Sequence, residues 1–135
     1  MDFIQEGQGI KMITQGLQVL IVDDNAMNRK MLSIVLKKMG IMTDEADGGP
    51  ACLELVSQKK YDVIFMDHLM PEMDGVETFH RIKELTNSLN PDTPVIALTA
   101  DDFGGGEAFF METGFSGYLV KPVLPKKLEE LIVSL

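Results

Sequence analysis

Hydrophobic residues in this chain occur in short continuous runs that alternate with stretches of helical spacing. Continuous apolar runs are typical of strands buried on both faces, and their bounds predict strands over residues 17–22, 41–46, 61–66, 95–98 and 116–120. The stretches between them place apolar residues three and four positions apart, which predicts a helix after each strand. This alternation is typical of a parallel sheet covered on both faces, so the pattern predicts an α/β domain.

Capping residues define the ends of several of these helices. Asn25 is a suitable N-cap and Gly40 a suitable C′ residue for the first helix, whose apolar stripe over residues 31–39 is expected to face the sheet. Pro50 and Pro125 fall in the first turn of the second and the last helix, where a missing N–H costs little. The predicted helices therefore start and stop where the predicted strands leave room for them.

The segment after the fourth strand is the least regular part of the pattern. Gly104, Gly105 and Gly106 stand where a helix should begin, and each costs about 1 kcal/mol relative to alanine inside a helix. We expect this helix to start late or to fray. The apolar residues 109–111 that follow are expected either in the core or on a partner-binding face.

Polar groups suited to phosphoryl chemistry follow four of the predicted strands. Asp23 and Asp24 follow the first strand, Asp67 the third, Thr99 the fourth and Lys121 the fifth. Strand ends of one parallel sheet converge on a single crevice, so we expect these groups to meet. Two carboxylates about 4 Å apart repel by roughly 4 kcal/mol at an effective dielectric near 20, so the cluster requires a cation. Mg²⁺ prefers such oxygen ligands, and Mn²⁺ is an alternative.

Composition and charge narrow the classes of function. A net charge of −9 and a pI near 4.6 argue against nucleic acid as a partner, because phosphate binding needs clustered Lys and Arg. No apolar run approaches the roughly 18 residues of a membrane span, and the opening residues lack a signal-peptide pattern, so we expect no membrane contact and a cytoplasmic location. The single cysteine, Cys52, and most of the ten methionines are expected in the core.

Four sequence motifs in order resemble the response-regulator receiver domain. They are VDDN at 22–25, MDHLMPEMDG at 66–75, ALTA at 97–100 and GYLVKP at 117–122. The resemblance covers nearly everything from residue 17 onward, so residues 17–135 are expected to form the receiver domain and residues 1–16 a leader or linker remnant. The amino-acid sequence of residues 23–40 also resembles that of receiver modules of hybrid sensor histidine kinases. The resemblance implies a flavodoxin-like, doubly wound fold: five parallel strands in the order 2-1-3-4-5 and five helices, in three αβα layers.

The resemblance also implies a role for each acidic residue. Asp67 would be the nucleophile that accepts a phosphoryl group and forms an aspartyl phosphate. Asp24 would bind Mg²⁺ directly and Asp23 partly through water, and the backbone carbonyl of Leu69 would complete the protein's share of the metal ligands. The metal set implied is therefore Asp23, Asp24, Asp67 and Leu69.

The remaining site residues are implied in the same way. Thr99 and Lys121 would hold the phosphoryl oxygens, and the ring of Tyr118 would follow the movement of Thr99 as a switch. The Lys121–Pro122 peptide bond would be cis. The phosphoryl donor would be a histidine kinase or a histidine phosphotransfer protein, and the output would be contact with a downstream protein or with a second copy of the chain. The domain would be a signalling phosphoacceptor that assists its own phosphorylation and dephosphorylation, rather than an enzyme.

Other functions on similar architectures stay open. A degenerate receiver could act as a protein-binding module without phosphorylation. A Mg²⁺-dependent haloacid-dehalogenase-type phosphatase would need an aspartate where Leu69 stands, and a flavodoxin-like cofactor site would place phosphate against Asp23 and Asp24, which would repel it. His68 and His80 are not assigned to a metal, and His68 is expected to be a solvated loop side chain.

Overall fold

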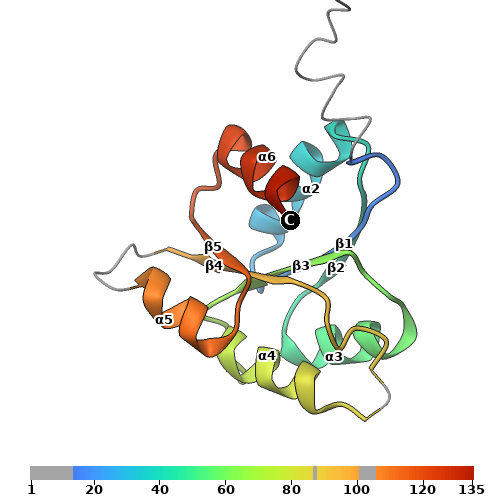
Figure 1. The fold of residues 1–135 in the computed structure, drawn as a ribbon, viewed down its shortest axis with the longest axis vertical. Coiled ribbons are helices and arrows are strands. Elements are labelled where there is room, and N and C mark those ends of the chain that lie inside the picture. The colour runs from blue at the N-terminus through green and yellow to red at the C-terminus, as the bar shows by residue number, and fades with distance from the viewer. Residues whose placement is uncertain (1–13, 87, 101–105) are drawn as a thin grey trace, which may run out of the picture.

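Five parallel strands form one sheet between two layers of helices in the computed structural model (Figure 1). The structure describes residues 14–86, 88–100 and 106–135. The strands lie in the order β2-β1-β3-β4-β5, which confirms the predicted topology. Their bounds are β1 Gln18–Val22, β2 Met42–Ala46, β3 Val63–Asp67, β4 Val95–Thr99 and β5 Gly117–Val120.

Five helices in the described ranges follow the five strands in turn. They are α2 Ala26–Lys38, α3 Gly49–Gln58, α4 Gly75–Glu84, α5 Gly106–Thr113 and α6 Pro125–Ser134. In Figure 1, α2 and α6 cover one face of the sheet, and α3, α4 and α5 cover the other. This is the predicted three-layer αβα arrangement.

The alternation of side chains along each strand divides the core into two clusters. On β1, Leu20 and Val22 belong to the cluster under α3, α4 and α5, while Val19 and Ile21 belong to the cluster under α2 and α6. Successive strand residues point to opposite faces, so a strand covered on both sides must be apolar at every position. This explains why the inner strands appear in the sequence as continuous hydrophobic runs.

The first helix begins and ends as predicted, but its apolar stripe is narrower. The side chain of Asn25 accepts a hydrogen bond from the backbone N–H of Asn28 at 3.0 Å, and Gly40 adopts a φ of +80° after the helix. Leu32 and Leu36 are buried against the sheet. Met31 is 57% exposed, so its predicted place on the buried face is wrong. It lies at the rim of the stripe, beside the segment that follows β5.

Other predictions needed correction at the strand ends and on the surface. β3 and β4 each extend one residue further than predicted and include Asp67 and Thr99 themselves. The edge strand β2 is less buried than the inner strands, with Met42 and Glu45 exposed, and its charged residues suit an edge that must not pair with another chain. Methionines are less buried than expected: those at positions 27, 31, 42 and 111 are exposed, while Met39, Met66 and Met70 are buried.

Cys52 is buried as predicted, whereas the apolar residues of α5 are partly buried and partly exposed. Cys52 is fully buried on α3, and burial raises the pKa of its thiol to about 12, so it packs as a small hydrophobe as predicted. On α5, Phe110 is fully buried, whereas Phe109 and Met111 are 42% and 48% exposed. The apolar run at 109–111 is therefore divided between core and surface.

The first described residues are bound to the domain. Thr14 is fully buried and its hydroxyl donates to the carbonyl of Met39, and the N–H of Gly16 donates to the carbonyl of Gly40 at 3.0 Å. These contacts join part of the predicted leader to the end of α2. Residues 1–13, together with Asn87 and residues 101–105, lie outside the described residues, so the helix predicted to begin at the glycine triplet after the fourth strand can be followed only from Gly106 onward.

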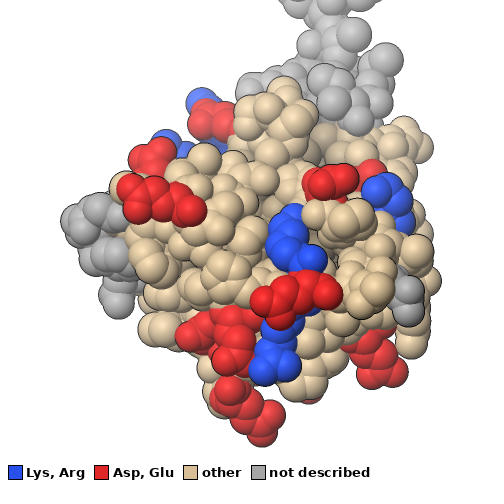
Figure 2. Space-filling view, turned by 60° about the horizontal axis from the view of Figure 1, so that its bottom comes forward, with Lys and Arg blue, Asp and Glu red and all other residues tan. Residues whose placement is uncertain are grey.

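The surface of the described part carries mixed charge. Figure 2 shows Asp and Glu side chains spread over one face, with Lys and Arg side chains lying among them. Within the described residues, no helix has both the length and the apolar character that crossing a bilayer would require.

Asn90 links two loops at the amino-terminal ends of the strands. It is fully buried, and its side-chain oxygen accepts from the backbone N–H of Tyr61 at 2.7 Å and from the hydroxyl of Thr93 at 2.9 Å. Its amide nitrogen donates to the carbonyls of Val56 and Lys59 at 2.9 and 2.7 Å. One side chain thus satisfies buried polar groups from the end of α3 to the start of β4.

Replacing Asn90 with alanine should strongly destabilise the fold. The substitution leaves several buried donors and acceptors unpaired, and each unpaired group costs about 1–3 kcal/mol, so we expect a loss of at least about 3 kcal/mol in the free energy of unfolding. Urea unfolding followed by circular dichroism measures this loss. Asp92→Ala, at an exposed position in the same loop, is the matched control and should change stability little. Equal stability of the two variants would contradict the role given to Asn90.

Candidate functional site

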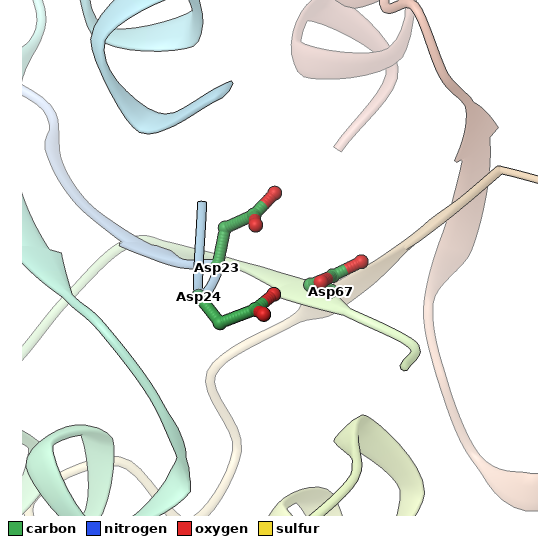
Figure 3. A group of neighbouring side chains, drawn as sticks. All are labelled: Asp23, Asp24 and Asp67. Atoms are coloured by element: carbon green, nitrogen blue, oxygen red, sulfur yellow. The ribbon is translucent and has the colours of Figure 1, made fainter. Parts of the chain in front are cut away.

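Three aspartates meet at the carboxyl ends of β1 and β3. Asp23 and Asp24 follow β1, Asp67 is the last residue of β3, and β1 and β3 pair in parallel register. One carboxylate oxygen from each of the three lies within 4.8 Å of the others. Figure 3 shows Asp24 extending toward Asp67 from the end of β1. The structure therefore brings together the acidic residues that the sequence predicted would converge.

Asp23 is held rigidly within this cluster. Its exposed fraction is 1%, and one carboxylate oxygen accepts from the backbone N–H of Asn25 at 2.9 Å. Its own N–H donates to the carbonyl of Ala46 on the edge strand β2 at 3.1 Å. Asp24, by contrast, is exposed. Burial and hydrogen bonding thus fix the carboxylate of Asp23, whereas the carboxylate of Asp24 is open to solvent.

Lys121 supplies the positive charge in this cluster. Its ammonium lies 2.7 Å from a carboxylate oxygen of Asp67 and 3.2 Å from one of Asp23. The backbone N–H of Lys121 donates to the carbonyl of Thr99 at 2.7 Å, which fixes the residue at the end of β5. The Lys121–Pro122 peptide bond is cis, the isomer that the resemblance implies. Three carboxylates and one ammonium leave a formal charge of −2, which a divalent cation would balance.

The protonation of Asp67 reflects this crowding. Burial raises the pKa of Asp67 to about 6, and the negative charge of Asp23 adds to that rise, against the opposing effect of Lys121. Burial also acts to lower the pKa of Lys121, but the hydrogen bond and charge of Asp67, together with Asp23, outweigh it and raise the pKa. Lys121 therefore stays charged, while the ionised form of Asp67 is only partly stabilised by the protein's own groups.

Thr99 and Tyr118 lie on the two strands next to the cluster. Thr99 is 3% exposed at the end of β4, and its neighbour Leu98 pairs with Asp67 in register. Tyr118 lies on β5 opposite Ala97, and its ring stacks on that of Phe110 with centroids 6.0 Å apart. Thr99 therefore borders the acidic cluster, and Tyr118 connects its strand to α5.

The loop after Asp67 depends on close backbone packing. A Cβ on Gly75 would lie 2.2 Å from the carbonyl oxygen of Asp67, and the N–H of Gly75 donates to the carbonyl of His68 at 2.8 Å. Only glycine allows α4 to begin this close to the end of β3. Leu69, expected to offer a backbone carbonyl to the metal, lies in this loop with its side chain 66% exposed.

The expectation that His68 is a solvated loop side chain is wrong. It is half-buried, and its ring packs edge-on against the fully buried ring of Phe110, with centroids 5.1 Å apart. The hydrophobic pattern could not show this, because the contact joins two segments far apart in the chain. His80 lies on α4 and is exposed, away from the acidic cluster.

Sequence reasoning missed one residue beside the site. The guanidinium of Arg29, on α2, donates to the backbone carbonyl of Asp23 at 2.7 Å and to the carboxylate of Glu45 at 3.1 Å. A basic residue in a helix is usually an exposed surface charge, so no pattern in the sequence distinguished Arg29 from its lysine neighbours.

A cavity of about 190 Å³ opens beside the cluster, between α2 and the segment that follows β5. Asp23 and Lys121 lie on its wall, and most of the remaining wall is apolar, including Met31 and Val123. The acidic cluster is therefore flanked by an accessible apolar surface.

The chain is similar to a known family along most of its length. The sequence profile of the response regulator receiver domain matches residues 19–133. Hybrid signal transduction histidine kinase I from Dictyostelium discoideum is 36% identical over 132 residues, which are 94% of this chain. The chain spans only 8% of the length of that kinase, so the similarity concerns one module of a much longer protein.

Solved structures of receiver domains have the same fold. The receiver domain of the histidine kinase CKI1 from Arabidopsis thaliana, complexed with Mg²⁺ and BeF₃⁻, is 33% identical and superposes with a TM-score of 0.79, covering 93% of both chains. The receiver domain of the sensor histidine kinase PA1611 from Pseudomonas aeruginosa, with magnesium in its active-site cleft, is 27% identical with a TM-score of 0.78, covering 88% of this chain and 96% of the other.

The raised pKa of Asp67 predicts how stability depends on pH. Its folded value near 6 lies above the unfolded value near 4, so the stability gained from its protonation is fully present below about pH 4 and lost as the pH rises through about 6. In EDTA at pH 8, Asp67→Asn should therefore be more stable than the wild type, by about 2 kcal/mol, with the gain shrinking toward pH 4. Urea unfolding of both proteins across this range measures the difference. A variant less stable than the wild type at pH 8 would refute the conclusion that ionised Asp67 destabilises the fold.

Proposed function

Since this chain belongs to the response regulator receiver family, we propose that its Asp67 accepts a phosphoryl group from a phosphohistidine and thereby switches a protein-interaction surface. The acidic cluster of Asp23, Asp24 and Asp67 is typical of the phosphoacceptor site of a phosphorelay. The observation that carries the proposal is the convergence of these three carboxylates with the ammonium of Lys121, which lies 2.7 Å from Asp67. We assign the receiver unit to residues 17–135.

Asp67 is the best-placed nucleophile among the three aspartates. It ends the central strand β3, and its ion pair with Lys121 orients the carboxylate toward the crevice. In the transfer, a carboxylate oxygen of Asp67 forms a bond to phosphorus as the bond from phosphorus to the donor's imidazole nitrogen breaks. The electron pair of the broken bond stays on that nitrogen, and the product is an acyl phosphate on Asp67. The buried Asp23 is already occupied by its contacts with Asn25 and Lys121.

The donor set fits a hard divalent cation, and we assign the metal role to Mg²⁺, with Mn²⁺ as an alternative. The charge of −2 and the oxygen ligands within 4.8 Å of one another match its preferences. Asp23, Asp24, Asp67 and the carbonyl of Leu69 would hold it. When bound, it would neutralise charge on the phosphoryl oxygens during transfer.

Lys121 and Thr99 would hold the transferred group. The ammonium of Lys121 is already within reach of Asp67 and would shift to a phosphoryl oxygen. Thr99, buried at the end of the adjacent strand, would donate its hydroxyl to another. Movement of Thr99 would open space that the ring of Tyr118 follows, and because that ring stacks on Phe110, α5 would respond. Phe109 and Met111 are exposed on the same helix and would form part of the switched surface, for a downstream protein or a second copy of the chain.

The apolar rim of the site suits a protein donor. Met27 and Met31 lie one helical turn apart on α2 and are 63% and 57% exposed, and Met31 shares the cavity wall with Asp23 and Lys121. We propose that a histidine kinase or histidine phosphotransfer protein docks on this rim to bring its phosphohistidine to Asp67. We place the exchange in the cytoplasm, because the buried thiol of Cys52 suits a reducing compartment.

Phosphorylation of Asp67 separates this function from that of a receiver which only binds proteins. Incubation with acetyl phosphate and Mg²⁺ should add one phosphoryl group to the wild-type protein, measured as a gain in intact mass. Asp67→Asn should gain none, and EDTA should abolish the gain in the wild type. Asp92→Asn, a matched change at an exposed position, should be labelled as the wild type is. An unlabelled wild type would favour the degenerate receiver, and rapid release of phosphate with many turnovers would favour the phosphatase.

Docking on α2 predicts that a surface substitution separates protein donors from small ones. Met31→Glu introduces a charge into the apolar rim and should slow phosphotransfer from a phosphorylated histidine phosphotransfer protein by about tenfold, the effect of a loss of about 1.4 kcal/mol. Labelling by acetyl phosphate should keep its wild-type rate, because the small donor needs no docking surface. Stopped assays with radiolabelled donors measure both rates. Met42→Glu, exposed on the edge strand β2, is the control. If Met31→Glu accepted the phosphoryl group from the protein donor at the wild-type rate, this docking face would be excluded.

A further inference from the structure

We propose that Arg29 is a positioning residue that fixes the peptide between Asp23 and Asp24 and thereby sets the affinity of the acidic cluster for a divalent cation. The inference rests on the proposed metal site and adds a residue that the proposed function does not use. Among the residues that the structure describes, Arg29 has hydrogen bonds or ion pairs with Asp23 and Glu45 but not with Asp24 or Asp67, so its effect would pass through the backbone.

The contacts of Arg29 form a bridge between α2, β1 and β2. Its Nη1 donates to the carbonyl oxygen of Asp23 at 2.7 Å, and its Nε donates to a carboxylate oxygen of Glu45 at 3.1 Å. The Glu45 side chain is 40% exposed, so its hydrogen bond with Arg29 faces solvent, whereas the Arg29 side chain is 17% exposed and its shorter hydrogen bond to Asp23 is partly shielded from water. A short charge-assisted hydrogen bond in such surroundings is about twice as strong as a neutral one.

The carbonyl that Arg29 holds belongs to the peptide that leads into Asp24. Rotating this peptide plane would change the direction in which the Asp24 side chain leaves the backbone, because a planar peptide moves as a unit. The carboxylate of Asp23 has its own anchors, namely the N–H of Asn25 and the ammonium of Lys121. Asp24 is exposed, so packing does not hold its side chain in place. Its position in the cluster therefore depends on the backbone that Arg29 fixes.

Glu45 makes this restraint compatible with a metal site. An unpaired guanidinium beside the cluster would repel a divalent cation, whereas the ion pair with Glu45 is formally neutral. The bridge can thus orient the ligand without opposing the metal. A purely electrostatic role for Arg29 predicts that removing its charge strengthens metal binding. A positioning role predicts the opposite sign.

Lysine at this position separates geometry from charge. It keeps the positive charge and a long aliphatic stem, but its ammonium is a single point and cannot reproduce the two directed N–H groups of the guanidinium. Arg29→Lys should therefore weaken metal binding if the fork is needed, and leave it unchanged if only charge matters.

The experiment is a Mg²⁺ titration of the full chain, without any phosphoryl donor, followed by backbone amide NMR shifts and by calorimetry. Arg29→Lys and Arg29→Gln should each bind Mg²⁺ about tenfold more weakly than the wild type, the lower end of the effect of losing a residue that orients a metal ligand. Higher ionic strength should not remove this ratio, because screening acts on charge and not on geometry. Arg81→Lys is the matched control, since Arg81 pairs with Glu77 at 3.4 Å on the exposed face of α4, and should bind as the wild type does.

Each outcome decides between the alternatives. Unchanged affinity in Arg29→Lys, or tighter binding in Arg29→Gln, would overturn the positioning role while the wild-type titration still supports the metal site. A wild type that binds no Mg²⁺ would overturn the proposed metal site and this inference together. Thermal unfolding without metal identifies any loss of folding in Arg29→Gln. The lysine variant keeps the charge and the stem, so a folded lysine variant with wild-type affinity is sufficient to reject the proposal.

Discussion

The burial of Asp67 beside a second buried carboxylate, at the carboxyl ends of the strands, is the constraint on which the rest of the site depends. Burial and the neighbouring carboxylate raise the pKa of Asp67 to about 6, and Lys121, at 2.7 Å, only partly offsets the negative charge. The fold thus keeps an arrangement that costs stability when no cation is bound. Such a cost is typical of a functional site, because the negative charges that destabilise the cluster would attract a divalent cation.

The two ends of the strands have different roles: the amino-terminal ends contribute stability, and the carboxyl-terminal ends carry the site. At the amino-terminal ends of the strands, Asn90 joins buried loops through four hydrogen bonds and leaves none of its own side-chain polar atoms unpaired. At the carboxyl ends, where the site lies, Gly75 lies against the backbone of Asp67 and the acidic cluster carries excess negative charge. A rigid scaffold beneath a charged, closely packed site would allow binding to change the local structure without unfolding the domain.

Much of this fold and site could be predicted because local rules and tertiary structure agree. Asn25 caps its helix through its own side chain, and the polar groups at strand ends converge because parallel strands all end at one edge. The incorrect predictions concern side chains whose burial depends on contacts with distant segments of the chain. Met31 has helical spacing consistent with burial but lies at the rim of α2, and His68 follows a strand yet packs against Phe110 from another helix.

The sequence by itself determined the order of elements along the chain, the two-faced burial of the inner strands and the convergence of the acidic residues with Lys121, because these follow from periodicity and from the polar residues that end the strands. Only the tertiary structure decided how those residues are held. The bridge from Arg29 to Asp23 and Glu45 joins one helix to two strand ends, and the pairing of Lys121 with Asp23 spans most of the chain. Contacts between distant segments depend on the packed geometry of the whole domain, which no local pattern contains.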